Sequence, residues 1–238
     1  MPNARRVIAA IAILGALATL VGLGSWQLAR RAEKHALMAH IAARMTAPPV
    51  ALPAAIPDPR AFDYRRVTVT GRYLHGREMR LLNRVVNGAA GTHVITPLVR
   101  EDGPTVLIDR GWVPHGFKPD DPRGLAMPTG RVTVTGIARV PVPPGPFVPA
   151  NEPGRGLWFS LDIPAMAAAK SLGALAPVVV WADAAPGGPW TFPLGGQARL
   201  ELRDDHLQYA LTWYSLAIVL VVIVLVAARR RRSPGQEA

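Results

Sequence analysis

Two apolar stretches decide the fold of this chain: VIAAIAILGALATLVGLGSWQL, Val7–Leu28, and LQYALTWYSLAIVLVVIVLVAA, Leu207–Ala228. Neither stretch contains a charged residue. About 20 apolar residues, each adding about 1.5 Å of helix, cross a bilayer core of about 30 Å, so each stretch can span a membrane once. Because the hydrocarbon holds no water to satisfy backbone groups, such a span must be helical. The sequence therefore predicts a membrane protein with two transmembrane helices that frame one domain.

Positive residues beside the spans predict the orientation. Arg5-Arg6 precede the first span, and Arg229–Arg232 follow the second. The positive residues within Arg30–Lys34 belong to a connection far longer than the roughly 60 residues over which such charges decide topology. Both tails are therefore expected in the cytoplasm. The expected organisation is a cytoplasmic tail (1–6), a first membrane helix (7–28), an exported domain (29–206, with a helical extension over 29–47), a second membrane helix (207–228) and a second cytoplasmic tail (229–238).

The first span has an alternative interpretation as a cleaved signal peptide. Arg5-Arg6 would be its charged start, and Ala16-Leu17-Ala18 is typical of a small-residue cleavage site. However, the apolar run continues to Leu28 and includes Trp26, a residue type that is enriched at membrane interfaces. These features favour a retained membrane helix.

The composition excludes several classes of function. Much of the net charge of +11 lies in the two tails, so the exported domain lacks the clustered basic face of a nucleic-acid-binding protein. The chain has no cysteine, which excludes disulfides, thiolate metal sites and a cysteine nucleophile. The sequence also lacks the G-x-S-x-G, G-x-G-x-x-G and P-loop motifs. We therefore expect that the protein is not an enzyme.

Between the spans, the hydrophobic period changes from that of a helix to that of strands. Ala29–Met45 lacks Gly and Pro and predicts a short amphipathic helix that continues the first span. Further on, period-two alternation between turn residues predicts a mainly antiparallel barrel or sandwich with one helix, Pro164–Lys170. The predicted strands are Arg65–Tyr73, Met79–Asn83, His93–Val99, Thr105–Val113, Arg131–Arg139, Leu157–Leu161 and Pro177–Ala182.

The hexapeptide RVTVTG occurs twice, at Arg66–Gly71 and at Arg131–Gly136. Alternating valine and threonine is typical of a half-buried strand, because successive side chains point to opposite faces of a sheet. The glycine at the end of each copy predicts a bend. The side chains expected to face inward are Val67, Val69, Val132 and Val134.

The helical extension carries side chains that could act as soft ligands for copper. These are His35, Met38, His40 and Met45. Helical spacing places His35 beside Met38, whereas His40 points elsewhere. We favour the simpler interpretation, an apolar stripe with exposed histidines.

His206 lies at the mouth of the second span, directly after Asp204-Asp205. On a helix, Tyr209, Ala210 and Trp213 follow it on one stripe. A neutral imidazole at this depth can bind haem iron axially, and aromatic and small residues can accommodate a flat macrocycle. An interfacial belt of amphipathic rings would explain the tyrosine and tryptophan without a ligand, but it does not explain the histidine.

Four segments resemble the surfeit locus protein 1 family: GLGSWQLARRAEK (Gly22–Lys34), LLNR (Leu81–Arg84), LIDRGWVP (Leu107–Pro114) and HLQYALTWYSLA (His206–Ala217). Members of that family are known as assembly factors of haem-copper cytochrome c oxidase, and bacterial members are linked to haem a handling. The resemblance implies that His206 contacts haem a through its iron, with Tyr209 and Trp213 beside it. Further positions that match the family signature, without an assigned role, are Trp26, Gln27, Arg30, Arg110, Gly111 and Trp112. Many members carry Asn where Asp109 stands, so the resemblance assigns no role to Asp109.

The leading hypothesis is a non-enzymatic assembly factor in a bacterial plasma membrane, with its main domain in the periplasm. It would bind haem a transiently and hand it over during maturation of the oxidase catalytic subunit. The expected partners are that subunit, the enzymes that supply haem a, and the lipid bilayer. A structural scaffold that contacts oxidase subunits without haem is an alternative. The absence of cysteine disfavours a copper-delivery factor, and the short second tail disfavours a transmembrane sensor.

Overall fold

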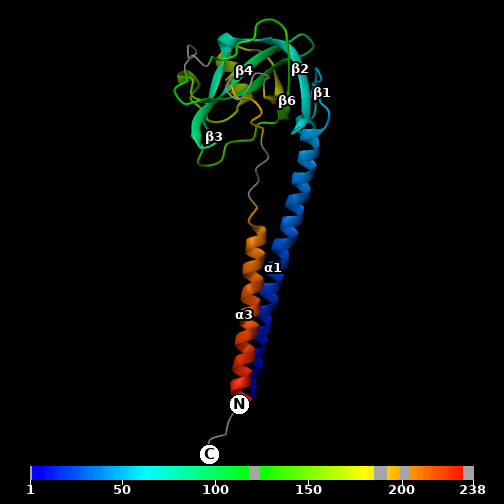
Figure 1. The fold of residues 1–238 in the computed structure, drawn as a ribbon, viewed down its shortest axis with the longest axis vertical. Helices are drawn as coiled ribbons and strands as arrows, with labels where there is room; N and C mark the ends of the chain where they lie inside the picture. The colour runs from blue at the N-terminus through cyan, green and yellow to red at the C-terminus, as the bar shows by residue number, and fades with distance from the viewer. Residues whose placement is uncertain (1, 118–123, 185–191, 199–203, 233–238) are drawn as a thin grey trace, which may run out of the picture. The chain divides into compact units, whose positions relative to one another are not determined.

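The computed structural model describes residues 2–117, 124–184, 192–198 and 204–232, and the chain divides into two compact units. The helical unit comprises residues 1–40 and 201–238, and the barrel unit comprises residues 41–200. Figure 1 shows the elements of both units, coloured along the chain.

The helical unit is built on α1, Pro2–Thr46, and α3, His206–Arg232. Both helices are long and apolar enough to cross a membrane, as the two apolar stretches predict. α1 continues without a break past Leu28, because the following residues lack Gly and Pro, and it ends before Pro48-Pro49. The predicted extension is therefore part of the same helix and not a separate element.

Small side chains line the contact between α1 and α3, which run side by side (Figure 1). Gly24, Ala210 and Ala217 are buried. A Cβ atom at Gly24 would lie 2.7 Å from a ring carbon of Tyr214, and Ser25 Oγ lies 3.0 Å from Tyr214 Oη. Small residues and hydroxyl contacts of this kind let two helix backbones approach closely within a membrane.

The described residues of the barrel unit form seven strands: β1 (Val50–Ala51), β2 (Arg66–Tyr73), β3 (Met79–Val86), β4 (Ala89–Arg100), β5 (Thr105–Pro114), β6 (Val132–Arg139) and β7 (Leu175–Ala182). Five of them close into a barrel in the order β2–β6–β7–β5–β4–β2. Neighbours in this ring are antiparallel except β5 and β7, which are parallel. β3 extends the sheet beyond β4, and β1 pairs in parallel with β2. The prediction of a mainly antiparallel β domain is confirmed, and its barrel form is the observed one.

Short helical segments connect the strands. α2, Ile163–Lys170, confirms the predicted internal helix, and the Asp162 side chain caps it by accepting the backbone N–H of Ala165 at 3.0 Å. The 3₁₀ segments are Pro59–Phe62, His75–Arg77 and Pro153–Arg155. A proline-rich loop, residues 140–152, connects β6 to the last of these.

The two RVTVTG copies pair with each other, because β2 and β6 are antiparallel neighbours. Val69 lies opposite Val134, and the hydroxyls of Thr70 and Thr133 are 2.9 Å apart on the outer face. The inward prediction is confirmed for Val67, Val69 and Val134, which are buried, whereas Val132 is half-buried and packs against the same core.

The glycine of each copy stands where the barrel turns toward its next strand. A Cβ atom at Gly71 would lie 2.2 Å from the carbonyl oxygen of Val99 on β4. A Cβ atom at Gly136 would lie 2.2 Å from that of Trp181 on β7. Only glycine permits this approach, so the shared hexapeptide reflects the same corner built twice.

One predicted strand is wrong. Leu157–Leu161 is not a strand and makes only single bridges, from Leu157 to Glu152 and from Trp158 to Leu81. The side chain of Asn151 replaces a neighbouring strand, because its Oδ1 accepts the backbone N–H groups of Phe159 (2.8 Å) and Ser160 (3.0 Å). The apolar alternation instead anchors the fully buried Trp158 beneath α2.

Candidate functional site: the mouth of the two membrane helices

His206 begins α3, and Asp204 holds this end of the helix. Asp204 Oδ1 accepts the backbone N–H of His206 at 3.1 Å. Its other oxygen, Oδ2, lies 2.6 Å from His35 Nε2 on α1 and 3.8 Å from Arg31 Nε. The carboxylate therefore ties the start of one membrane helix to the side of the other.

The pKa of the Asp204 carboxyl lies below its usual value. Desolvation raises it, but the hydrogen bonds from His35 and from the backbone of His206, together with the charges of these two histidines, lower it by more. A carboxylate with a lowered pKa contributes stability at pH values above its unfolded pKa, and this contribution is lost as the pH falls through the folded value. The contribution of the Asp204 carboxylate to the contact between α1 and α3 is therefore present at neutral pH and is lost in acid.

The imidazole of His206 is oriented by Gln27. His206 Nδ1 lies 2.8 Å from Gln27 Oε1, and an amide oxygen can only accept a hydrogen bond. The proton of a neutral His206 ring is therefore on Nδ1, which leaves the lone pair of Nε2 for another ligand. Histidines that bind metals are commonly oriented through their second nitrogen in this way.

A hollow of about 400 Å³ lies beside His206, and it is lined by Arg30, Glu33, Lys34 and Leu37. Arg30 is exposed and forms an ion pair with Glu33 at 2.7 Å. Basic side chains on α1 thus border the space that His206 lines, so a ligand carrying carboxylates would find complementary charge there.

The residues that follow His206 on its predicted stripe along α3 differ in exposure. Ala210 is buried against α1 and Trp213 is half-buried, but Tyr209 is 55% exposed. Trp26, another signature residue, is 54% exposed. The exposure of Tyr209 and Trp26 fits the interfacial aromatic belt that the sequence leaves as an alternative for these rings.

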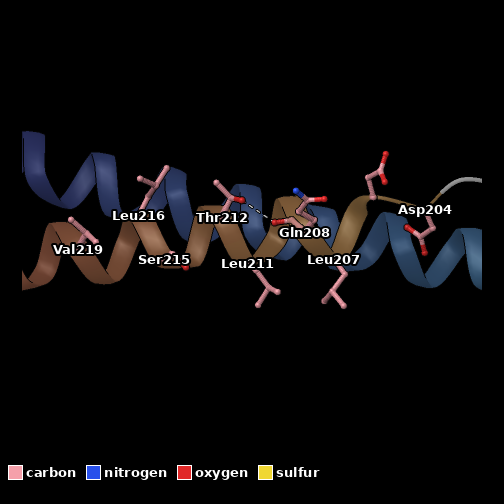
Figure 2. A pocket seen from close by; sticks show the side chains of 9 residues that line it. Asp204, Leu207, Gln208, Leu211, Thr212, Ser215, Leu216 and Val219 are labelled. Atoms are coloured by element: carbon pink, nitrogen blue, oxygen red, sulfur yellow. Dashed lines mark hydrogen bonds between the residues drawn. The ribbon is translucent and has the colours of Figure 1, made fainter.

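A second groove, of about 670 Å³, runs along α3 (Figure 2). Its apolar walls include Leu207, Leu211 and Leu216, all more than 40% exposed. The hydroxyl of Thr212 donates to the backbone oxygen of Gln208 at 2.9 Å, so it is satisfied within the helix. This face is suited to contact with lipid.

Among the possible copper ligands of α1, one histidine already has a partner. His35 is engaged by Asp204. Within the part of the chain that the structure describes, no group of three or more His, Cys, Asp or Glu side chains could hold a metal ion.

In the barrel unit, the segments Leu81–Arg84 and Leu107–Pro114 lie on β3 and β5, on either side of β4. Asp109 is buried, and its two oxygens accept from Gly111 N–H at 3.0 Å and contact His93 Nδ1 at 2.7 Å. Trp112 Nε1 donates to the backbone oxygen of Arg84 at 3.2 Å.

The signature residues Arg110 and Gly111 are structural in this arrangement. Arg110 is buried, donates to the backbone oxygen of Ala126, and lies 5.0 Å from the ring centre of Tyr73. Burial lowers the pKa of Arg110 and raises that of Tyr73. Gly111 has a φ of 117°, and a Cβ atom there would lie 2.1 Å from the oxygen of Leu194. These residues fasten β5 to neighbouring segments.

Comparison with known proteins adds the family. The model of the SURF1 family matches residues 14–218, which is most of the chain. This chain belongs to the SURF1 family. It is 38% identical over 217 residues to mouse surfeit locus protein 1, covering 84% of this chain and 69% of the mouse protein. Human surfeit locus protein 1 is 35% identical over 218 residues (84% and 70%), and a SURF1-like protein of Monosiga brevicollis is 35% identical over 219 residues (87% and 83%).

The SURF1 family segments therefore fall into one pair in each unit. Gly22–Lys34 and His206–Ala217 build the mouth of the helix pair, and the other two build the buried cluster around Asp109. Sequence reasoning missed three contacts, which are Gln27 with His206, His35 with Asp204, and His93 with Asp109. The partners of the first two pairs lie 179 and 169 residues apart, so no local spacing could indicate them.

Proposed function

We propose that this SURF1-family protein assists the assembly of cytochrome c oxidase by holding haem a at His206 and releasing it to the oxidase catalytic subunit. The orientation of His206 by Gln27 carries the proposal. A histidine with Nδ1 bound and Nε2 available, at the end of a membrane helix, has the form of an axial ligand. Membership of the SURF1 family supports the oxidase as the destination.

The residues present fit a haem. When bound, haem would supply an iron that accepts an imidazole nitrogen and two carboxylates that favour positive charge nearby. His206 would provide the imidazole, while Arg30 and Lys34 on the same hollow provide positive charge on the side of α1. Trp213, which is half-buried and lies seven residues after His206 on α3, would provide packing for an apolar edge.

Co-purification with haem a tests this function against the scaffold alternative. We expect the full-length protein, produced in cells that make haem a and purified in mild detergent, to carry haem a at up to one equivalent. The measurement is its absorbance spectrum and the extracted pigment. A scaffold that only contacts oxidase subunits would purify without haem under the same conditions, and that result would contradict the proposal.

We also propose that both ends of the chain are cytoplasmic, because the arginines at Arg5-Arg6 and Arg229–Arg232 lie just outside the spans. A reporter enzyme that is active only outside the cytoplasm should be active when fused after Pro146 and silent when fused after Ala238. The reverse pair of activities would contradict this orientation. The appropriate host is a bacterium that respires with its own cytochrome c oxidase.

A further inference from the structure

Arg84, the last residue of the LLNR segment, takes no part in the proposed haem site. Its side chain is half-buried, and burial lowers its pKa. The nearby charge of Asp109 raises that pKa, but both oxygens of Asp109 are already engaged by His93 and Gly111. The guanidinium of Arg84 forms no hydrogen bond or ion pair with the residues that the structure describes, so its donors remain for a ligand.

The guanidinium lines a pocket of about 230 Å³ in the barrel unit. The pocket contains no acidic side chain, and Trp181 and Phe159 contribute aromatic walls. A second arginine, Arg139, also lines the pocket, but its side chain already binds other residues. Arg139 donates to Asp63 at 3.1 Å and to the hydroxyl of Tyr64 at 3.0 Å, and it lies over the Tyr64 ring at 3.9 Å. Arg84 is therefore the cation that can receive a ligand.

An apolar groove of about 860 Å³ adjoins this pocket. The two share a wall that includes Val140, Pro141, Val142 and Leu161. The groove continues toward Ile163 and Leu175. Its size is that of a site for a small organic ligand. Of the polar side chains that line it, Asn151 accepts from the backbone of Phe159 and Ser160, and Asp162 caps α2. One unpaired cation thus lies at the end of a long apolar surface.

We propose that the barrel unit binds a long-chain fatty acid, with its carboxylate on Arg84 and its acyl chain along the proline-rich groove. The planar guanidinium matches a carboxylate with two parallel hydrogen bonds. The carboxylate would bind the guanidinium that, among the described residues lining the pocket, donates to no protein acceptor, and the acyl chain would cover valine and proline side chains of the groove. The ligand is thus specified by one charge and one apolar chain.

Photolabelling of the full-length protein in lipid nanodiscs tests the proposal. The probe is a 16-carbon fatty acid with a diazirine in its chain, and the matched control is the corresponding alcohol. Trypsin cuts after Arg139 and Arg155, so one peptide carries the groove wall and another, from α3, reports labelling from the bilayer. The ratio of groove label to α3 label corrects for partition of the probe into lipid.

We expect the acid to label the groove peptide and the alcohol to label only the membrane helices. Arg84→Met should lower the groove-to-α3 ratio at least about tenfold, since a charge-assisted hydrogen bond is lost. Arg72→Met, which removes an exposed arginine on β2 away from the pocket, should leave the ratio unchanged. An unchanged thermal unfolding of the barrel in Arg84→Met would show that the loss is not unfolding.

Two results would overturn the proposal. One is equal labelling of the groove by the acid and the alcohol, which would mean that Arg84 does not bind the carboxylate. The other is a wild-type ratio in Arg84→Met. If Arg84→Met unfolds the barrel, Arg84→Lys is the substitute, because it keeps the charge but loses the planar fork, and it should show an intermediate ratio.

Discussion

Replacing His206 with alanine should abolish haem binding while the protein remains folded and inserted. Under the proposed function, the imidazole would contribute the bond from the protein to the iron, whereas Trp213 would contribute packing alone. The span does not need a polar residue at its mouth, so insertion should be unaffected. The measurement is haem a occupancy of the purified protein, from its absorbance spectrum, at matched protein concentration.

Matched substitutions distinguish the loss of an iron ligand from a loss of local structure where α1 and α3 meet. Trp213→Ala should weaken haem binding without removing it. Gln27→Ala should keep haem but change its spectrum and reduction potential, because His206 Nδ1 loses its acceptor at 2.8 Å. His40→Ala, an exposed histidine on α1, should behave as wild type. Wild-type occupancy and spectrum in His206→Ala would place the haem elsewhere or favour the scaffold.

Val69→Asp should unfold the barrel, whereas Thr68→Asp should be tolerated. Val69 is 2% exposed and faces the barrel interior opposite Val134. A carboxylate of similar size there would be buried without a partner, at a cost of several kcal/mol against a typical domain stability of about 5–15 kcal/mol. Thr68 points to the opposite face and lies beside Thr135, where water can reach a charge.

The membrane helices remain helical in both variants, so far-ultraviolet circular dichroism alone would not report this difference. Near-ultraviolet circular dichroism and limited proteolysis of the region between the helices would do so, since the barrel contains buried Trp112 and Trp158. Val69→Ala should unfold at a lower temperature but still fold, because it loses packing without adding charge. Equal behaviour of Val69→Asp and Thr68→Asp would contradict the facing of β2.

Local patterns predicted the elements that a short stretch of chain can specify. An uncharged run of about 20 residues predicts a membrane helix, and the alternation of RVTVTG predicts that its valines share one face of a strand. Leu157–Leu161 shows the limit of such patterns. Its apolar residues alternate like a strand, but the side chain of Asn151 takes the backbone donors that a strand would give to a neighbour.

In the candidate site, too, the sequence predicted some features and the tertiary structure added others. The depth of His206 and the family segments around it are readable in the sequence, and they indicate a haem ligand. The sequence does not show that Gln27 orients the His206 ring or that Asp204 contacts His35. These contacts are visible only once α1 and α3 are placed beside each other. Likewise, His93 has no partner at any local spacing, and Asp109 reaches it only because β4 and β5 pair.

The sequence by itself determined the two membrane helices, most of the strands and the inward faces of the RVTVTG copies, because each depends on interactions within a few residues or with the solvent. Only the tertiary structure decided that these strands close into a barrel, with β5 parallel to β7 and the two copies paired. It also decided that the Arg84 guanidinium lines a pocket near the charge of Asp109 and that His206 is oriented by Gln27. Hydrogen bonds and ion pairs between distant residues have no period in the sequence, so they are settled when the chain packs.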